Sequence, residues 1–164
     1  MSDYIFTSGD VDESISIMKE AARWLDDSGK TMWRTRELDR SVLQNPPEEF
    51  IVMYDPGGES IATLLLSFED KLFFPDIRAG TSGFIHKLAI RRRYAGKGHI
   101  KRLIDYVASV CREKGITSLR LDCDANRKSL CDFYERSGFN LIEKKVMEFL
   151  HFGKIDVALY RLDF

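Results

Sequence analysis

The sequence predicts an α/β fold in which a mixed central sheet carries helices on both faces. Two observations predict it. Apolar segments at residues 49–54 and 60–68 flank an Asp-Pro-Gly-Gly turn, which is the pattern of an antiparallel hairpin. Farther along, a strand at 84–90, an amphipathic helix at 97–114 and a strand at 118–123 form a crossover unit, which joins parallel strands. The sheet is therefore expected to begin antiparallel and to become parallel at the crossover.

The N-terminal part of the chain supplies an edge strand and two helices. Residues 4–7 are a candidate edge strand, and apolar residues recur at helical spacing over 11–25. Asp10 or Asp12 can cap the start of that first helix. A second helix is expected over about 32–43, because an Asn-Pro-Pro segment then ends it.

The C-terminal part supplies a loop, a short helix and two strands. The segment 69–83 is rich in aromatic and turn residues, so we expect a loop that lines a pocket or covers a sheet edge. A helix over 128–137 ends at Gly138. Two antiparallel strands, over 140–149 and 155–164, complete the sheet.

Length, charge and cysteine content narrow the class of protein. The 164 residues suffice for one domain with a sizeable core, so we expect a single domain over 1–164. A net charge of −1 provides no bulk attraction to nucleic acid or membrane. The three cysteines lack C-x-x-C spacing, which argues against a disulfide framework or a zinc site. No apolar stretch approaches the roughly 18 residues of a membrane-spanning helix. We therefore expect a cytoplasmic protein that binds no metal.

The segment after the central strand has the chemistry of a phosphate-binding turn. Arg93, Gly96 and Gly98 stand in an R-x-x-G-x-G spacing before a helix N-terminus. The first N–H groups of a helix and its dipole favour an anion, and glycines let the backbone approach it closely. A P-loop is excluded because no Ser or Thr follows Lys97, and a dinucleotide fingerprint because Lys101 stands where its third glycine would be. The alternative is a surface turn with a solvated run of charge.

A second motif follows about 30 residues later. Residues 126–139 read N-x-x-x-L-x-x-F-Y-E-x-x-G-F. Together the two motifs resemble the GCN5-related N-acetyltransferase (GNAT) superfamily, whose pyrophosphate motif is (Q/R)-x-x-G-x-(G/A). They span residues 84–139, about a third of the chain, and the order of elements extends the likeness to nearly all of it. The segment His86-Lys-Leu-Ala-Ile-Arg-Arg resembles the bacterial, small-molecule type.

The resemblance implies a GNAT-like fold, a mostly antiparallel sheet whose parallel central strands splay apart to admit acetyl-CoA. Splayed strands leave backbone groups unpaired, and the pantetheine amides can pair with them as an added strand would. Arg93 would brace the turn or bond the pyrophosphate. The residues that the resemblance assigns to acetyl-CoA are Leu88, Ala89, Ile90, Arg93, Tyr94, Ala95, Gly96, Lys97, Gly98, His99, Ile100, Asn126 and Phe133. Asn126 can equally be the N-cap of the helix that begins at Lys128.

Acetyl transfer to an amine needs a neutral amine, a polarised thioester carbonyl and an acid for the departing thiolate. Tyr134 aligns with the usual acid of the family, since a phenol with a pKa of about 10 is protonated at neutral pH. The alternative is a core aromatic beside Phe133. His86 is the best candidate for the base, because an imidazole pKa of about 6.5 suits that work. It can also be a histidine that is hydrogen-bonded within the sheet, in which case Asp122, Asp124 or water would act.

The resemblance implies a small molecule with a primary amine as acceptor. Specificity would come from the N-terminal helices, the loop at 69–83 and the last two strands, and Trp33 belongs either to the core or to the acceptor pocket. Three alternatives stay open: a sensor that binds acyl-CoA without turnover, acetylation of a protein or peptide amine, and a nucleic-acid clamp at residues 91–93, which the balanced charge disfavours. The family also permits a homodimer through the last strands, and we expect no nucleic-acid or membrane partner.

Overall fold

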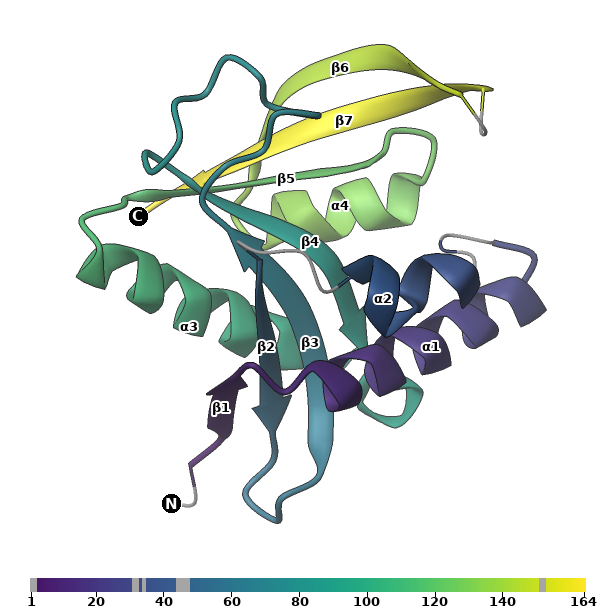
Figure 1. Ribbon diagram of the computed structural model, residues 1–164, viewed down its shortest axis with the longest axis vertical. Coiled ribbons are helices and arrows are strands. Elements are labelled where there is room, and N and C mark those ends of the chain that lie inside the picture. The colour runs from purple at the N-terminus through teal and green to yellow at the C-terminus, as the bar shows by residue number, and fades with distance from the viewer. Residues whose placement is uncertain (1–2, 31–32, 34, 44–47, 151–152) are drawn as a thin grey trace. The chain divides into compact units, whose positions relative to one another are not determined.

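The computed structural model in Figure 1 describes residues 3–30, 33, 35–43, 48–150 and 153–164. In these residues seven strands form a mixed, mostly antiparallel sheet with one parallel pair, in the order β1-β2-β3-β4-β5-β7-β6. The strands are β1 (Ile5–Ser8), β2 (Glu49–Tyr54), β3 (Ser60–Ser67), β4 (Gly83–Ile90), β5 (Ser118–Asp124), β6 (Asn140–Phe149) and β7 (Gly153–Asp163). The helices are α1 (Val11–Asp27), η1 (Thr35–Leu38), α2 (Arg40–Leu43), η2 (Arg92–Tyr94), α3 (His99–Glu113) and α4 (Lys128–Arg136), with η marking 3₁₀ turns. The expected α/β class is confirmed.

Residue contacts divide the chain into two compact units. The first comprises Met1–Ser67 and Ile85–Val107, and the second comprises Phe68–Phe84 and Ala108–Phe164. Among the described residues, every helix is too short or too polar to cross a bilayer.

In the first unit an antiparallel sheet carries α1. Phe50 of β2 lies opposite Leu65 of β3, which confirms the predicted hairpin, and β1 pairs with β2 at the sheet edge, also as predicted. α1 packs on β2 and β3 because its apolar residues recur on one face. The core of this unit consists of the buried residues Ile15, Ile17, Met18, Ala22, Leu38, Leu43, Phe50, Val52, Leu65 and Ala89.

A pair of hydroxyl groups joins α1 to the sheet inside that core. Ser14 and Thr63 are fully buried, and their hydroxyl oxygens lie 2.5 Å apart. Thr63 Oγ1 donates its own hydrogen to the Ile51 carbonyl at 2.7 Å, so the Ser14 hydroxyl is the donor of the pair. A polar contact of this kind fixes the position of α1 along the sheet more narrowly than apolar packing does.

The predicted helix over about 32–43 is wrong as one continuous element. The structure has the 3₁₀ turn η1 followed by the single-turn helix α2, separated by Asp39. The Asp39 carboxylate accepts hydrogen bonds from the N–H and the hydroxyl of Ser41, both at 3.1 Å. This contact starts a new helix, because an aspartate side chain replaces the missing intrahelical partner. The predicted start and the Asn-Pro-Pro end signal lie outside the described residues.

β4 contains a backbone irregularity at its centre. Lys87 has a φ of 53°, and among the described residues it is the only one other than glycine with a positive φ. A left-handed residue inside a strand interrupts the alternation of side chains between the two faces and turns its peptide groups out of the regular ladder. The alternation of side chains along β4 therefore cannot be continued from His86 across Lys87 to Leu88.

α3 begins at His99, two residues later than predicted. Gly96 and Gly98 have φ values of 75° and 81°, which are incompatible with an α-helix. The helix therefore starts only after the second glycine. The preceding residues form the 3₁₀ turn η2, and Tyr94 N–H donates to the Arg91 carbonyl at 2.9 Å.

In the second unit β7 pairs with both β5 and β6, in each case antiparallel. β6 lies at the edge, where Figure 1 shows it as the outer strand of a long hairpin with β7. The loop that precedes β4 covers this sheet. Phe74 belongs to a buried cluster with Phe84, Val157 and Leu159, and Phe73 packs against the cluster.

The three cysteines are all free and buried. Cys123 of β5 and Cys131 of α4 lie with their sulfur atoms 3.8 Å apart. Burial raises the pKa of the Cys123 thiol, so it stays protonated. The three cysteines are therefore small residues of the core.

The hydroxyl pair gives a prediction for stability. Thr63→Val leaves the Ser14 hydroxyl buried without an acceptor, so we expect the free energy of unfolding to fall by about 1–3 kcal/mol. Ser14→Ala leaves Thr63 its bond to the Ile51 carbonyl and should cost less. Urea unfolding of both single variants and of the double variant gives the coupling energy. Strict additivity of the two substitutions would contradict the contact.

Candidate functional site

The turn between β4 and α3 is braced by the β2–β3 hairpin. Arg93 forms an ion pair with Glu59, and the Tyr94 hydroxyl donates to Asp55 Oδ2 at 2.9 Å. Asp55 in turn accepts the N–H groups of Gly57 and Glu59, each at 2.9 Å. These contacts lower the pKa of Asp55, first through the Glu59 N–H and then through Tyr94, so the carboxylate stays ionised. Arg93 therefore has the bracing position that is one of its two predicted roles.

The two glycines of the turn make an open approach to the start of α3. A Cβ atom built on Gly96 or Gly98 would meet no heavy atom of the described residues within 4 Å, so these residues leave the space beside both backbones open. The N–H groups of the first four residues of α3 have no partner within the helix. A turn of this shape offers backbone donors and a positive helix end to an anion such as a diphosphate.

His99, the first residue of α3, is held between two tyrosine rings. Its ring centroid lies 5.8 Å from that of Tyr4 and 5.4 Å from that of Tyr94, both with edge-on geometry. Burial lowers the pKa of His99, and the nearby Arg102 and Lys97 lower it further. The imidazole is therefore mostly neutral at pH 7 and adds no cation to the turn.

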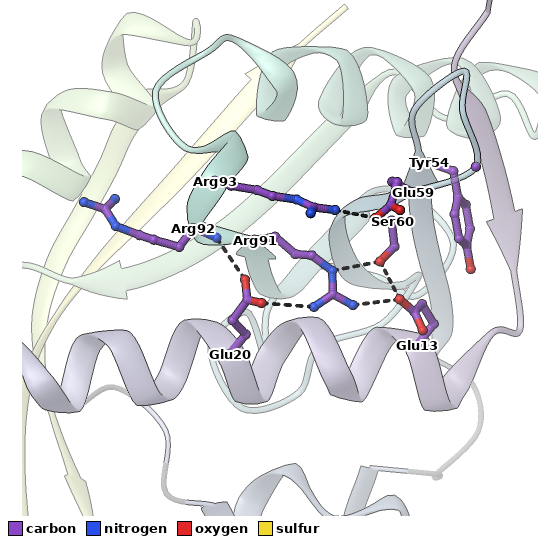
Figure 2. A pocket seen from close by; sticks show the side chains of 9 residues that line it. Glu13, Glu20, Tyr54, Glu59, Ser60, Arg91, Arg92 and Arg93 are labelled. Atoms are coloured by element: carbon purple, nitrogen blue, oxygen red, sulfur yellow. Dashed lines mark hydrogen bonds and ion pairs between the residues drawn. The ribbon is translucent and has the colours of Figure 1, made fainter.

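Next to the turn lies a cavity of about 720 Å³ lined by residues of α1, the β2–β3 hairpin and the segment 91–93. Figure 2 shows that Arg91 points into the space between Glu13 and Glu20, whereas Arg92 points away. Arg91 contacts Glu13 at 2.7 Å and Glu20 at 3.3 Å, and its Nε donates to Ser60 Oγ at 2.8 Å. The hydrogen bond from Ser60 and the pairing with Arg91 lower the pKa of Glu13. The charges of this wall thus neutralise one another.

Arg92 and Arg93 complete that wall without forming a phosphate clamp. The Arg92 guanidinium stacks 4.0 Å from the centre of the Trp24 ring, and the Arg92 N–H donates to Glu20 at 3.0 Å. Arg93 forms its ion pair with Glu59. Since each arginine of the segment has an acidic or aromatic partner, the predicted alternative of a nucleic-acid clamp gains no support.

The predicted base lies on β4, beside the irregularity. His86 is half-buried, and its Nε2 lies 3.3 Å from Ser67 Oγ. The neighbouring Lys87 places its ammonium 5.3 Å from the centre of the Trp33 ring, which packs partly buried against the core of the first unit. Among the strand residues assigned to acetyl-CoA, Ala89 is buried, whereas Leu88 and Ile90 are partly exposed.

In the second unit, Tyr134 is buried on α4 within a group of aromatic rings. The ring centroids of Phe133, Phe139 and Tyr160 lie 5.5, 5.8 and 6.1 Å from its own. Burial raises the pKa of Tyr134, and the nearby Cys123 raises it further. The phenol therefore stays protonated throughout the neutral range, as a proton donor must.

Asn126 does not cap α4. The N-cap is Arg127, and the Asn126 amide instead donates to Asp156 Oδ2 of β7 at 3.0 Å. The alternative that made Asn126 an N-cap is therefore wrong. Asp124, one of the weaker candidates for the base, accepts the Asn126 N–H at 2.9 Å and so shapes the turn before α4.

Two features of the site could not be found in the sequence. A lysine in a strand gives no signal for the left-handed backbone of Lys87. The Arg91 contacts join residues more than 70 positions apart, and only the spacing of Glu13 and Glu20 at two turns on one helix face could have suggested a shared partner.

Comparison with known proteins agrees with this geometry. Residues 18–139 match the Acetyltransferase (GNAT) family. The uncharacterized N-acetyltransferase YesJ of Bacillus subtilis (strain 168) is 26% identical over 154 residues, which cover 84% of this chain and 86% of that protein.

Solved structures share the fold. An acetyltransferase of the GNAT family from Listeria monocytogenes superposes with a TM-score of 0.72 at 18% identity, covering 98% of this chain and 95% of that one. A Bacillus anthracis protein in complex with acetyl coenzyme A superposes with a TM-score of 0.59 at 17% identity, covering 76% and 67%. With its family match over most of the sequence, the chain belongs to the acetyltransferase (GNAT) family.

Proposed function

We propose that this protein is an acetyl-CoA-dependent N-acetyltransferase that acetylates the primary amine of a small molecule by direct attack. The observation that carries the proposal is the turn of Gly96 and Gly98 at the start of α3, in a chain of the GNAT family. Its open backbone fits the diphosphate of coenzyme A by shape and by charge. The co-substrate supplies an acetyl group activated as a thioester.

The residues that would hold acetyl-CoA come from three segments. Ala95 to Ile100 would donate backbone N–H groups to the diphosphate, while Arg93 and Tyr94 keep the turn in place. The strand segment 88–90 would pair with the pantetheine amides, and the irregularity at Lys87 supports this because it disturbs the regular ladder beside that segment. Asn126 and Phe133 would also contact the pantetheine arm.

Tyr134 would act as the general acid and His86 as the base. The amine nitrogen bonds to the carbonyl carbon as the C–S bond breaks, and Tyr134 gives its phenolic proton to the departing sulfur. His86, directly or through water, takes the proton that the amine loses, and the N–H of Leu88 would polarise the carbonyl. The raised pKa of Tyr134 supports its role, since it keeps the proton available. The contact of His86 with Ser67 supports a fixed imidazole.

Two alternative functions predict different results in an acetyl-transfer assay. A sensor would bind acetyl-CoA without transfer, and a peptide acetyltransferase would accept peptides but no small amine. Thiol release from acetyl-CoA with polyamines, amino acids, arylalkylamines, aminoglycosides and short peptides separates all three. We place the protein in the cytoplasm, which its free buried cysteines support.

The glycine turn gives a binding prediction. Gly98→Ala puts a side chain where φ is 81° and where the cofactor backbone contact is proposed, so we expect acetyl-CoA affinity to fall at least about tenfold in calorimetry. Gly29→Ala is the matched control, because Gly29 also has a positive φ, of 73°, and open space around it. Equal affinity in the two variants would contradict the proposed turn.

The acid role gives a kinetic prediction. Tyr134→Phe should lower kcat by roughly 10²–10⁴-fold, the usual effect of one acid–base group, while acetyl-CoA affinity stays within about threefold. Tyr160→Phe is the control, because this second buried tyrosine donates to Glu135 at 3.0 Å and should affect stability rather than kcat. Because the pKa of Tyr134 is raised, ionisation of Tyr134 should cause no loss of wild-type activity between pH 7 and its ordinary pKa of about 10. A Tyr134→Phe enzyme with full kcat would exclude the role.

We also propose a homodimer through β6. This strand lies at the sheet edge and exposes Ile142 and Val146 by 53% and 61%, a surface that an antiparallel partner strand would cover. Light scattering should give twice the chain mass of 18.9 kDa, and Val146→Lys should give the single mass. Leu72→Lys, at a loop residue of similar exposure, should leave the dimer intact. A wild-type monomer at micromolar concentration would exclude the dimer.

A further inference from the structure

Arg120 of β5 is a buried cation with no partner in the part of the chain that the structure describes. Its residue exposure is 9%, and its Nε is buried without a hydrogen-bond acceptor. No ion pair joins its guanidinium to any described residue. The centre of the Phe74 ring lies 5.8 Å from its guanidinium carbon.

The surroundings of Arg120 make the site more positive. Arg161 of β7 lies directly opposite Arg120 in the sheet, and residues opposite each other share a face. Arg161 is paired with Asp163 at 2.7 Å, so that acid is already engaged. Burial lowers the pKa of Arg120 and Arg161 lowers it further, while Asp163 raises it and offsets only part of these two effects.

A buried guanidinium without an anion is costly, because it has lost water and gained no counter-charge. A ligand that supplies the missing charge would offset this cost. The natural complement of a guanidinium is a carboxylate, which accepts two parallel N–H bonds from its planar fork.

The same face of β5 continues with acidic residues. Side chains alternate along a strand, so Arg120, Asp122 and Asp124 share one face, with Cα atoms about 6.8 Å apart at each step. Asp124 already accepts the Asn126 N–H and lies 3.9 Å from Arg127 Nε. A cation followed by Asp122 on the same face is complementary to a molecule that carries a carboxylate at one end and an amine at the other. The acidic end suits an acceptor amine, which arrives protonated and must approach before it loses its proton.

We propose that Arg120 binds the carboxylate of the acceptor, and that the acceptor is therefore an amino acid or a closely related amino carboxylate. The identification of this ligand as the acceptor rests on the proposed acetyltransferase function. The proposal that Arg120 binds a carboxylate does not depend on that function. Arg120 is then a specificity residue, and it takes no part in the proton transfers.

The test compares acceptors that differ only in the carboxylate. The substrates are α-, β- and γ-amino acids and their carboxamides, assayed by thiol release from acetyl-CoA with the full chain and with Arg120→Met. We expect the wild type to prefer an amino acid to its amide by at least about tenfold in kcat/KM, mainly through KM. Arg120→Met should abolish this preference and leave the amide rates unchanged. Arg161→Gln, which removes the neighbouring cation already held by Asp163, should reduce the preference less than about threefold.

A thermal measurement separates binding from a structural role. Without ligand, Arg120→Met should unfold at the same or a higher temperature than the wild type, because it removes an uncompensated buried charge. A clear fall in Tm would show that Arg120 serves the fold through Phe74 and would overturn the proposal. Equal kcat/KM for amino acids and their amides in the wild type would also overturn the proposal. So would a preference for amino acids that persists in Arg120→Met.

A binding measurement distinguishes failure of the proposed carboxylate site from failure of the proposed acetyltransferase function. The reaction products, N-acetyl amino acids and their amides, are titrated by calorimetry into protein saturated with coenzyme A. Tighter binding of the acids that depends on Arg120, in a protein without transferase activity, supports the carboxylate site while the proposed enzyme function fails. Equal binding of acids and amides overturns the site whether or not transfer occurs.

Discussion

The geometry of the first unit depends on the interactions of the Arg91 guanidinium. It bonds Glu13 and Glu20 of α1 and Ser60 of β3 while its own backbone follows β4 directly. Its backbone N–H also donates to the Ile61 carbonyl at 2.8 Å. One residue thus fixes a helix, two strands and the first residue of the turn. Hydrogen bonds to charged groups contribute roughly 1.5–3 kcal/mol each, about twice a neutral bond, so the arrangement is strongly preferred over neighbouring ones.

The titratable groups of the two units differ in the charge state that their surroundings favour. The acids near the turn have partners that keep them ionised, as at Glu13 and Asp55. The phenols of Tyr54 and Tyr134 are held neutral. Burial and Asp10 raise the pKa of Tyr54 to about 12, and burial raises that of Tyr134 as well. The ionised acids thus position the backbone while the phenols keep their protons, and these two charge states require opposite environments.

The sequence predicted the order of elements well, because each long element carries a periodic apolar pattern and ends in a recognisable turn residue. The hairpin after Tyr54 and the late start of α3 both depend on local glycine chemistry, yet only the hairpin was placed correctly. The start of α3 was missed because two glycines in the left-handed conformation cannot be told from flexible ones by composition. The break at Asp39 depends on one side-chain hydrogen bond that competes with a helical pattern. The strand irregularity at Lys87 depends on tertiary surroundings alone, and so do the pairing of Asn126 with Asp156 and the burial of Arg120.

The burial of all three cysteines also determines how the protein behaves toward thiol reagents. Disulfide reagents and alkylating agents react with the thiolate, and a buried protonated thiol such as Cys123 supplies almost none. The folded protein therefore gives almost no signal in a colorimetric thiol assay. In a reaction mixture, the signal comes from liberated coenzyme A alone. Once the chain unfolds, three thiols per molecule become reactive together. The same reagent then reports the fraction of unfolded molecules. Absorbance recorded with and without acetyl-CoA therefore distinguishes turnover from denaturation.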